Sequence, residues 1–191
     1  MSSYNENTDQ TSVIDREETT PKSVPICLVG LGYVGLPLAV EFDHAGQRVL
    51  GYDIDEERIE RLRRGIDVTD EVGDAAIAES DVQFTADPAA IADAEYVFIT
   101  VPTPVDEFQN PDFRFVEQAG QTIGEHLTQD TTVILESTVY PGATRDVLVP
   151  ALEAASDLTA DDEFHVAYSP ERTSPGDDEH GIREVVKVVG A

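Results

Sequence analysis

The stretch that decides the fold of this 191-residue chain is Gly30-Leu31-Gly32-Tyr33-Val34-Gly35, which directly follows the apolar run Pro25–Val29. Gly30 suits a tight turn between a strand and a helix, and Gly32 has no side chain to keep a phosphate from the backbone. Gly35 allows the new helix to pack close to the sheet. The free N–H groups and the dipole at the start of that helix favour negative charge. We therefore predict a phosphate-binding turn over residues 30–35.

A carboxylate follows the next apolar run, Arg48–Tyr52. This residue, Asp53, lies eighteen positions after Gly35. A carboxylate at this place accepts hydrogen bonds from the ribose hydroxyls of an adenosine and repels the additional phosphate of NADP. Alternatively, Asp53 is a turn residue or the N-cap of a helix near Glu56. Together with the glycine turn, Asp53 predicts a site for NAD, and a methyl-donor-binding domain of the same shape is the competing interpretation.

Short apolar runs alternate with helical patterns along the rest of the chain, which predicts an α/β domain of the doubly wound Rossmann type with strand order 3-2-1-4-5-6. Runs such as "YVFITV" show no alternation of apolar and polar residues, as expected for strands with helices on both faces. The segment Gly65–Ser80 is hard to assign, and Glu184–Val189 is a candidate for a further strand. The expected strands are Pro25–Gly30, Arg48–Tyr52, Val82–Phe84, Tyr96–Val101, Thr132–Leu135 and Phe164–Tyr168. The expected helices are Tyr33–Ala45, Glu56–Arg64, Asp74–Ala78, Pro88–Ala92, Phe113–Leu127 and Ala143–Ala155.

The composition is strongly acidic, with 39 Asp and Glu against 12 Lys and Arg and a net charge of −27. Such a surface repels nucleic acid, and it either binds metals or basic partners or keeps the protein soluble at very high salt. The acidic residues are spread along the chain rather than gathered in one tail. Salt near 1 M screens charges beyond about 3 Å. We therefore expect a protein adapted to very high salt that is less stable in dilute buffer.

The remaining composition limits the class of protein. Residues 1–23 are predicted to be a disordered leader, and residues 24–191 an NAD-binding domain. The chain has no apolar run long enough to span a membrane and no secretory signal, so we expect a cytoplasmic protein. The single cysteine, Cys27, lies within an apolar strand and is expected to be inert. The histidines lack metal-ligand spacing, so we expect no metal site; they are His44, His126, His165 and His180.

Five motifs identify a family. "GLGYVGLPLA", "GYDID", "VPTPVD", "ESTVYPGAT" and "SPERTSPG" occur in the order and spacing typical of the UDP-glucose/GDP-mannose dehydrogenase family, which the chain resembles over residues 24–191. Enzymes of this family oxidise the C6 alcohol of a nucleotide sugar to a carboxylate with two molecules of NAD. The resemblance implies an oxidoreductase of nucleotide-sugar metabolism that makes a UDP-hexuronic acid for a surface polysaccharide or glycoprotein glycan.

The resemblance also assigns cofactor residues. It implies that Asp53 and Arg58 hold the adenosine end of NAD. It places the backbone of Val101, Pro102 and Thr103 beside the cofactor, where an ordinary strand-ending turn is the alternative.

Two hydroxyls lie after the fifth expected strand. Ser137 and Thr138 can present them to the nicotinamide edge, and Thr138 resembles a family residue that helps to place a water molecule. From the residues alone, without the resemblance, the interpretation of Ser137 and Thr138 as helix caps is favoured.

The last motif carries the candidate base. Glu171 resembles the family glutamate with a general-base or water-activating role, which partial burial would support by raising its pKa. Arg172 suits binding of a substrate carboxylate or phosphate, or a structural pairing with a glutamate at the surface. Because Pro175 stands where the UDP-glucose branch usually has a second glutamate, the sequence is more similar to the branch that acts on UDP-N-acetylhexosamines.

The family's central helix and its C-terminal sugar-binding domain, with the nucleophilic cysteine, have no counterpart among these motifs. We therefore expect this chain to be the NAD-binding half of a longer homodimeric enzyme, monomeric and inactive alone. Two other hypotheses stay open: a stand-alone NAD-binding regulatory module, and a hydroxyacid or 6-phosphogluconate-type dehydrogenase. "ESTVYPG" and "SPER" argue against the second of these.

Overall fold

Six parallel strands form one sheet in the computed structural model, which describes residues 25–105, 107, 111–170 and 188–190. The order is β3-β2-β1-β4-β5-β6, and every neighbouring pair is parallel. This confirms the predicted doubly wound sheet, whose strand order reverses between β1 and β4. The strands are β1 (Pro25–Val29), β2 (Arg48–Tyr52), β3 (Gln83–Thr85), β4 (Tyr96–Ile99), β5 (Thr132–Leu135) and β6 (His165–Tyr168).

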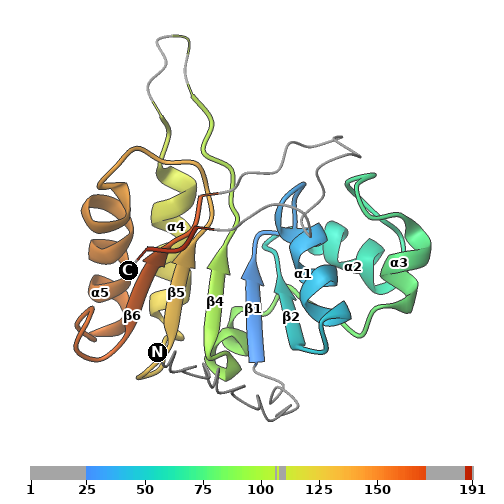
Figure 1. Ribbon diagram of the computed structural model, residues 1–191, viewed down its shortest axis with the longest axis horizontal. Coiled ribbons are helices and arrows are strands. Elements are labelled where there is room, and N and C mark those ends of the chain that lie inside the picture. Colours follow the sequence, from blue (N-terminus) through green and yellow to red (C-terminus); the bar gives the residue numbers. More distant parts are fainter. Residues whose placement is uncertain (1–24, 106, 108–110, 171–187, 191) are drawn as a thin grey trace, which may run out of the picture.

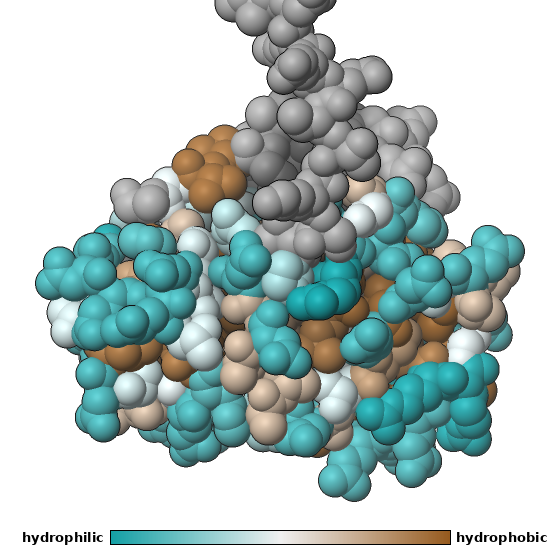
Figure 2. Space-filling model, turned by 90° about the horizontal axis from the view of Figure 1, so that it is seen from below, coloured by the Kyte–Doolittle hydropathy of each residue, from teal (hydrophilic) through white to brown (hydrophobic). Residues whose placement is uncertain are grey.

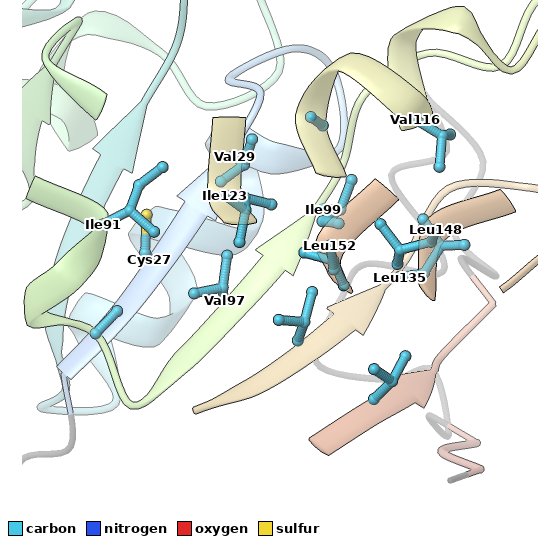
Figure 3. Close-up of a cluster of buried hydrophobic side chains, with 14 of the residues drawn as sticks. Cys27, Val29, Ile91, Val97, Ile99, Val116, Ile123, Leu135, Leu148 and Leu152 are labelled. Carbon is cyan, nitrogen blue, oxygen red and sulfur yellow. The ribbon is translucent and has the colours of Figure 1, made fainter. Parts of the chain in front are cut away.

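Helices cover both faces of the sheet (Figure 1). Successive side chains of β1 belong to different cores: Cys27 and Val29 pack with α4 and α5 (Figure 3), whereas Ile26 and Leu28 pack with α1 and α2. This burial on both faces explains why the strands show no alternation in sequence. The helices are α1 (Gly35–His44), α2 (Glu56–Arg63), α3 (Asp74–Glu79), η1 (Pro88–Asp93), α4 (Arg114–Gly124), η2 (Thr144–Leu148) and α5 (Val149–Ser156).

Two expected helices differ in type. The segment Pro88–Asp93 is a 3-10 helix, capped by the carboxylate of Asp87, which accepts from the amide of Ala89 at 3.0 Å. The helix expected from Ala143 begins as a single π turn, η2, and becomes α-helical at Val149. Pro150 cannot donate to the carbonyl four residues before it and its ring crowds that carbonyl, which accounts for the wider turn.

The segment that was hard to assign is organised by one buried carboxylate. Asp67 accepts hydrogen bonds from the amides of Thr69, Val72 and Gly73 at 2.8–2.9 Å, and from the Thr69 hydroxyl at 2.9 Å. Burial by itself would raise the pKa of Asp67, but these hydrogen bonds outweigh it and lower the pKa below its usual value. The Asp67 carboxylate therefore holds this loop in place ahead of α3.

The surface at the amino ends of the strands is largely hydrophilic (Figure 2). Tyr96, at the start of β4, is among its partly exposed residues. Within the described ranges, no helix is long and apolar enough to cross a membrane. Most of the candidate strand Glu184–Val189 lies outside the described residues, but Gly190 forms an antiparallel bridge with Tyr168 of the edge strand β6.

Candidate functional site: the carboxyl edge of the sheet

The glycine turn joins β1 to α1 at the point where the strand order reverses. Gly30 has a φ of +97°, a conformation that favours glycine. A Cβ on Gly35 would lie 1.9 Å from the carbonyl oxygen of Gly30 and 2.4 Å from the Thr100 hydroxyl. Close packing therefore requires glycine at position 35, as the sequence predicted.

Gly32 differs from Gly35 because it faces open space. A Cβ there would meet nothing within 4 Å. The amides of Gly32, Tyr33 and Val34 donate no hydrogen bond to any described residue, and they stand at the amino end of α1. Tyr33 is exposed beside them. Amide donors without a partner among the described residues, next to a residue without a side chain, suit a phosphate, and the phosphate-binding role of residues 30–35 stays a prediction.

Asp53 lies beside this turn and is 5% exposed. Its Oδ2 accepts from the amide of Leu31 and from Nη1 of Arg58, both at 2.8 Å, while Oδ1 accepts from the amide of Asp55 at 2.9 Å. The cap of α2 is Asp55, whose side chain accepts from the amide of Arg58. Asp53 is therefore not the helix cap, although it does stabilise the turn between β2 and α2.

Arg58 is brought to the same place by the first turn of α2. Because a carboxylate has about four acceptor sites, the three hydrogen bonds to Asp53 leave about one of them open. Asp53 thus keeps room for about one further donor, such as a ribose hydroxyl, while Arg58 stands beside it.

The loops after β4 and β5 contain the other predicted cofactor residues and are tied to each other. The hydroxyl of Thr103 donates to the carbonyl oxygen of Thr138 at 2.7 Å, and the hydroxyl of Ser137 donates to that of Val101 at 2.6 Å. Neither Ser137 nor Thr138 caps a helix, because the residues before η2 and α5 are Ala143 and Leu148. The Ser137 hydroxyl is thus used within the protein, whereas the exposed Thr138 stays at the open edge. Pro102 lies exposed in the first loop.

Thr100 supports the glycine turn and was not predicted. Its hydroxyl donates to the carbonyl of Gly30 at 2.7 Å and lies 3.2 Å from the carbonyl of Val29. The two segments are seventy residues apart in sequence. No local pattern signals such a contact, which follows only from the pairing of β4 with β1.

The remaining candidates have different outcomes. Glu171 and Arg172 lie outside the described residues, so their predicted roles stay predictions. Cys27 is fully buried, and burial raises the pKa of its thiol to about 12, which keeps it protonated and unreactive. Within the described ranges, no three His, Cys, Asp or Glu side chains are grouped in a way that could hold a metal ion.

Comparisons with known proteins agree with this geometry. Residues 24–191 match the NAD-binding domain of the UDP-glucose/GDP-mannose dehydrogenase family. Two similar relatives are a UDP-N-acetyl-D-glucosamine 6-dehydrogenase of Pseudomonas aeruginosa, 46% identical over 87% of this chain and 40% of its own length, and protein CapL of Staphylococcus aureus, 43% identical over 86% and 38%. A UDP-D-ManNAc dehydrogenase of Pyrococcus horikoshii is similar in structure, with a TM-score of 0.78 and 31% identity over 87% of this chain and 41% of its own.

The chain thus spans about two fifths of the length of these relatives. The family match sets aside the competing interpretation of a methyl-donor-binding domain, because the matched family domain binds NAD. With the glycine turn, the buried carboxylate and the sheet order in agreement, the chain belongs to the UDP-glucose/GDP-mannose dehydrogenase family and carries its NAD-binding domain.

Proposed function

We propose that this chain is the NAD-binding half of an enzyme that oxidises the C6 alcohol of a UDP-N-acetylhexosamine to the uronate. The observation that carries the cofactor part is the site at the β1–α1 turn, where free amides, the open space at Gly32 and the carboxylate of Asp53 lie together. The sugar part is supported by the relatives named UDP-N-acetyl-D-glucosamine 6-dehydrogenase and by Pro175 in the last motif.

Each predicted residue has a place in this proposal. The amides of Gly32, Tyr33 and Val34 bind the pyrophosphate, while Asp53, which holds the Leu31 amide, and Arg58 bind the adenosine ribose. The backbone of residues 101–103 and the Thr138 side chain flank the nicotinamide end, and Ser137 fixes their loop. NAD, when bound, would accept the hydride. Glu171 acts as the base, and Arg172 binds the substrate.

Separate titrations of NAD and NADP test the cofactor assignment. They are done by calorimetry in molar KCl with the unchanged chain, Asp53→Asn and a control, Asp81→Asn. Asp81 is exposed and precedes β3, so it lies at the amino ends of the strands, away from the site. We expect saturable binding of NAD, NADP at least tenfold weaker, and a tenfold or greater loss of NAD affinity in Asp53→Asn only. Equal binding of NAD and NADP by a folded chain would contradict the assigned role of Asp53.

The sugar requires the remainder of the enzyme. We propose that the whole protein contains a further sugar-binding domain and forms a homodimer in the cytoplasm, whereas this chain alone is monomeric and inactive. A protein produced from the complete gene, with NADH formation followed by absorbance, is expected to turn over UDP-N-acetylhexosamines faster than UDP-glucose. Faster turnover of UDP-glucose, or of a small hydroxyacid, would overturn this substrate assignment.

The acidic composition supports a further part of the proposal, adaptation to very high salt. Like charges repel each other over about 10 Å at 0.1 M salt but over only about 3 Å at 1 M. With a net charge of −27, the folded chain is expected to have a higher melting temperature in 2 M KCl than in 0.1 M KCl. Circular dichroism measures this directly, and a melting temperature independent of KCl would remove the proposal.

A further inference from the structure

Two aromatic rings connect the loops that flank the nicotinamide end in the proposed function. Phe113 precedes α4, and Tyr140 lies in the loop after β5; their ring centroids are 5.3 Å apart with an interplanar angle of 68°. Phe113 is partly buried and packs against the core cluster formed with α4 and α5. The edge-to-face arrangement is one that aromatic pairs prefer. The pair therefore attaches the end of the Tyr140 loop to a fixed point of the fold.

The rings complete a set of contacts around Thr138. On one side, the Ser137 hydroxyl binds the carbonyl of Val101, and the Thr138 carbonyl itself accepts from Thr103. On the other side, the carbonyl of Tyr140 accepts from the amide of Ala143 at 3.1 Å, closing a turn. Thr138 is thus fixed before and after its own position, while its side chain remains exposed. The ring pair is a contact of an accessible side chain, because Tyr140 is 43% exposed.

We infer that Tyr140, resting on Phe113, is a positioning residue for the nicotinamide end of the cofactor. This inference depends on the proposed function. The adenosine end is held by Asp53 and the glycine turn, which belong to β1, β2 and their loops and make none of these contacts. Loss of the Tyr140 ring therefore loosens the loop that carries Thr138 without affecting the adenosine site.

The test compares two ligands that differ at that end. NADH contains the nicotinamide, whereas ADP-ribose lacks it but keeps the adenosine, the pyrophosphate and the second ribose. Both are titrated by calorimetry in molar KCl into the unchanged chain, Tyr140→Ala and Tyr140→Phe. The matched control is Tyr96→Ala. Tyr96 is 41% exposed, much like Tyr140, but it is the first residue of β4 and so lies at the amino ends of the strands, away from the cofactor site. Bound NADH is also followed by its fluorescence, which reports the surroundings of the nicotinamide ring.

We expect Tyr140→Ala to weaken NADH about threefold to tenfold, the equivalent of one aromatic pair. Its affinity for ADP-ribose should stay within about twofold of the unchanged chain, which also shows that the variant is folded. Tyr140→Phe keeps the ring and should restore both the NADH affinity and the fluorescence of the bound form. Tyr96→Ala should change neither ligand. If Tyr140→Ala does not fold, Tyr140→Leu, which keeps apolar bulk without the ring, is measured in its place.

The outcomes separate this inference from the proposed function. An equal change for both ligands, or no change for either, would overturn the positioning role of Tyr140 while leaving the NAD site intact. Failure of Tyr140→Phe to restore NADH binding would also overturn it. If the folded, unchanged chain binds neither NADH nor ADP-ribose, the proposed cofactor site itself is wrong.

Discussion

The glycine turn after β1 and the paired loops after β4 and β5 lie along the same edge of the sheet but are built in different ways. The shape of the turn depends on the absence of side chains: Gly35 leaves room for the carbonyl of Gly30, and Gly32 leaves open space. The shape of the paired loops instead depends on side-chain contacts: hydroxyls join segments 35 and 36 residues apart, and the rings of Phe113 and Tyr140 add a further contact. The first kind of site is largely encoded within six residues, and the second depends on the whole sheet.

The difference has a consequence for substitution. A glycine that makes room for other atoms tolerates no side chain, whereas a loop held by several weak contacts loses them one at a time. We therefore expect a large, all-or-none effect on stability at Gly35 and smaller, graded effects in the loops. Four predictions test this contrast, from the largest effect to the smallest.

The largest effect is expected for Gly35→Ala. The added Cβ would lie 1.9 Å from the Gly30 carbonyl oxygen, so α1 must move away from the sheet. Overpacking against backbone that cannot relax is expected to lower the free energy of unfolding by about 3 kcal/mol or more. Denaturation in molar KCl measures this loss. A variant as stable as the unchanged chain would show that the turn relaxes easily and would remove the contrast.

Asp67→Asn comes next and tests whether a local contact is enough for a large effect. The carboxylate accepts from three amides and a hydroxyl within six residues of it, so its loss should lower the free energy of unfolding by about 2 kcal/mol. Because folding lowers the pKa of Asp67, its contribution is complete above the unfolded pKa of about 3.9. The contribution disappears as the pH falls through the lower folded pKa.

The pH dependence supplies the control for Asp67. The difference in stability between the unchanged chain and Asp67→Asn should be constant from about pH 5 to pH 7 and should shrink below about pH 4. Unfolding of both proteins by denaturant at several pH values measures it. A difference that grows as the pH falls would contradict a lowered pKa of Asp67.

The fold was predictable from the sequence to a large extent, because its signals are local. The order of apolar runs and glycines predicted all six strands, their order and the helices on both faces. Element ends were less accurate: β4 ends at Ile99 rather than Val101, and α1 begins at Gly35 rather than Tyr33. The π turn at Thr144–Leu148 was missed because Pro150 acts on hydrogen bonds four residues before it.

The candidate site was predictable only where its residues belong to consecutive strands of the chain. The glycine turn and Asp53 belong to consecutive strands, so their spacing shows them together. The contacts of Thr100 with Gly30 and of Phe113 with Tyr140 join distant segments and leave no trace in spacing. The Asp67 loop is the instructive exception, since its contacts are local but depend on burial that the sequence pattern does not reveal.

Gly32→Ala is the third prediction and separates the two glycines. Since a Cβ at position 32 meets nothing within 4 Å, the free energy of unfolding should change by less than about 1 kcal/mol. In the proposed function the same methyl group occupies the space of the pyrophosphate, so NAD affinity should fall about tenfold or more, the equivalent of about 1.4 kcal/mol. Denaturation and calorimetry on one preparation measure both. Unchanged NAD affinity would show that the pyrophosphate does not approach Gly32.

The smallest effect concerns the two hydroxyls that join the loops. Removing either one, in Thr103→Val or Ser137→Ala, should lower the free energy of unfolding by about 1 kcal/mol, the usual contribution of one hydrogen bond. Because the two bonds run in opposite directions between the same loops, each holds the other's partners in place. The double variant should then lose less than the sum of the single losses, with a coupling of at least about 0.5 kcal/mol. Strictly additive losses would mean that each loop is held in place by its own strand. The conformation of the paired loops would then depend on residues close in sequence, as that of the glycine turn does.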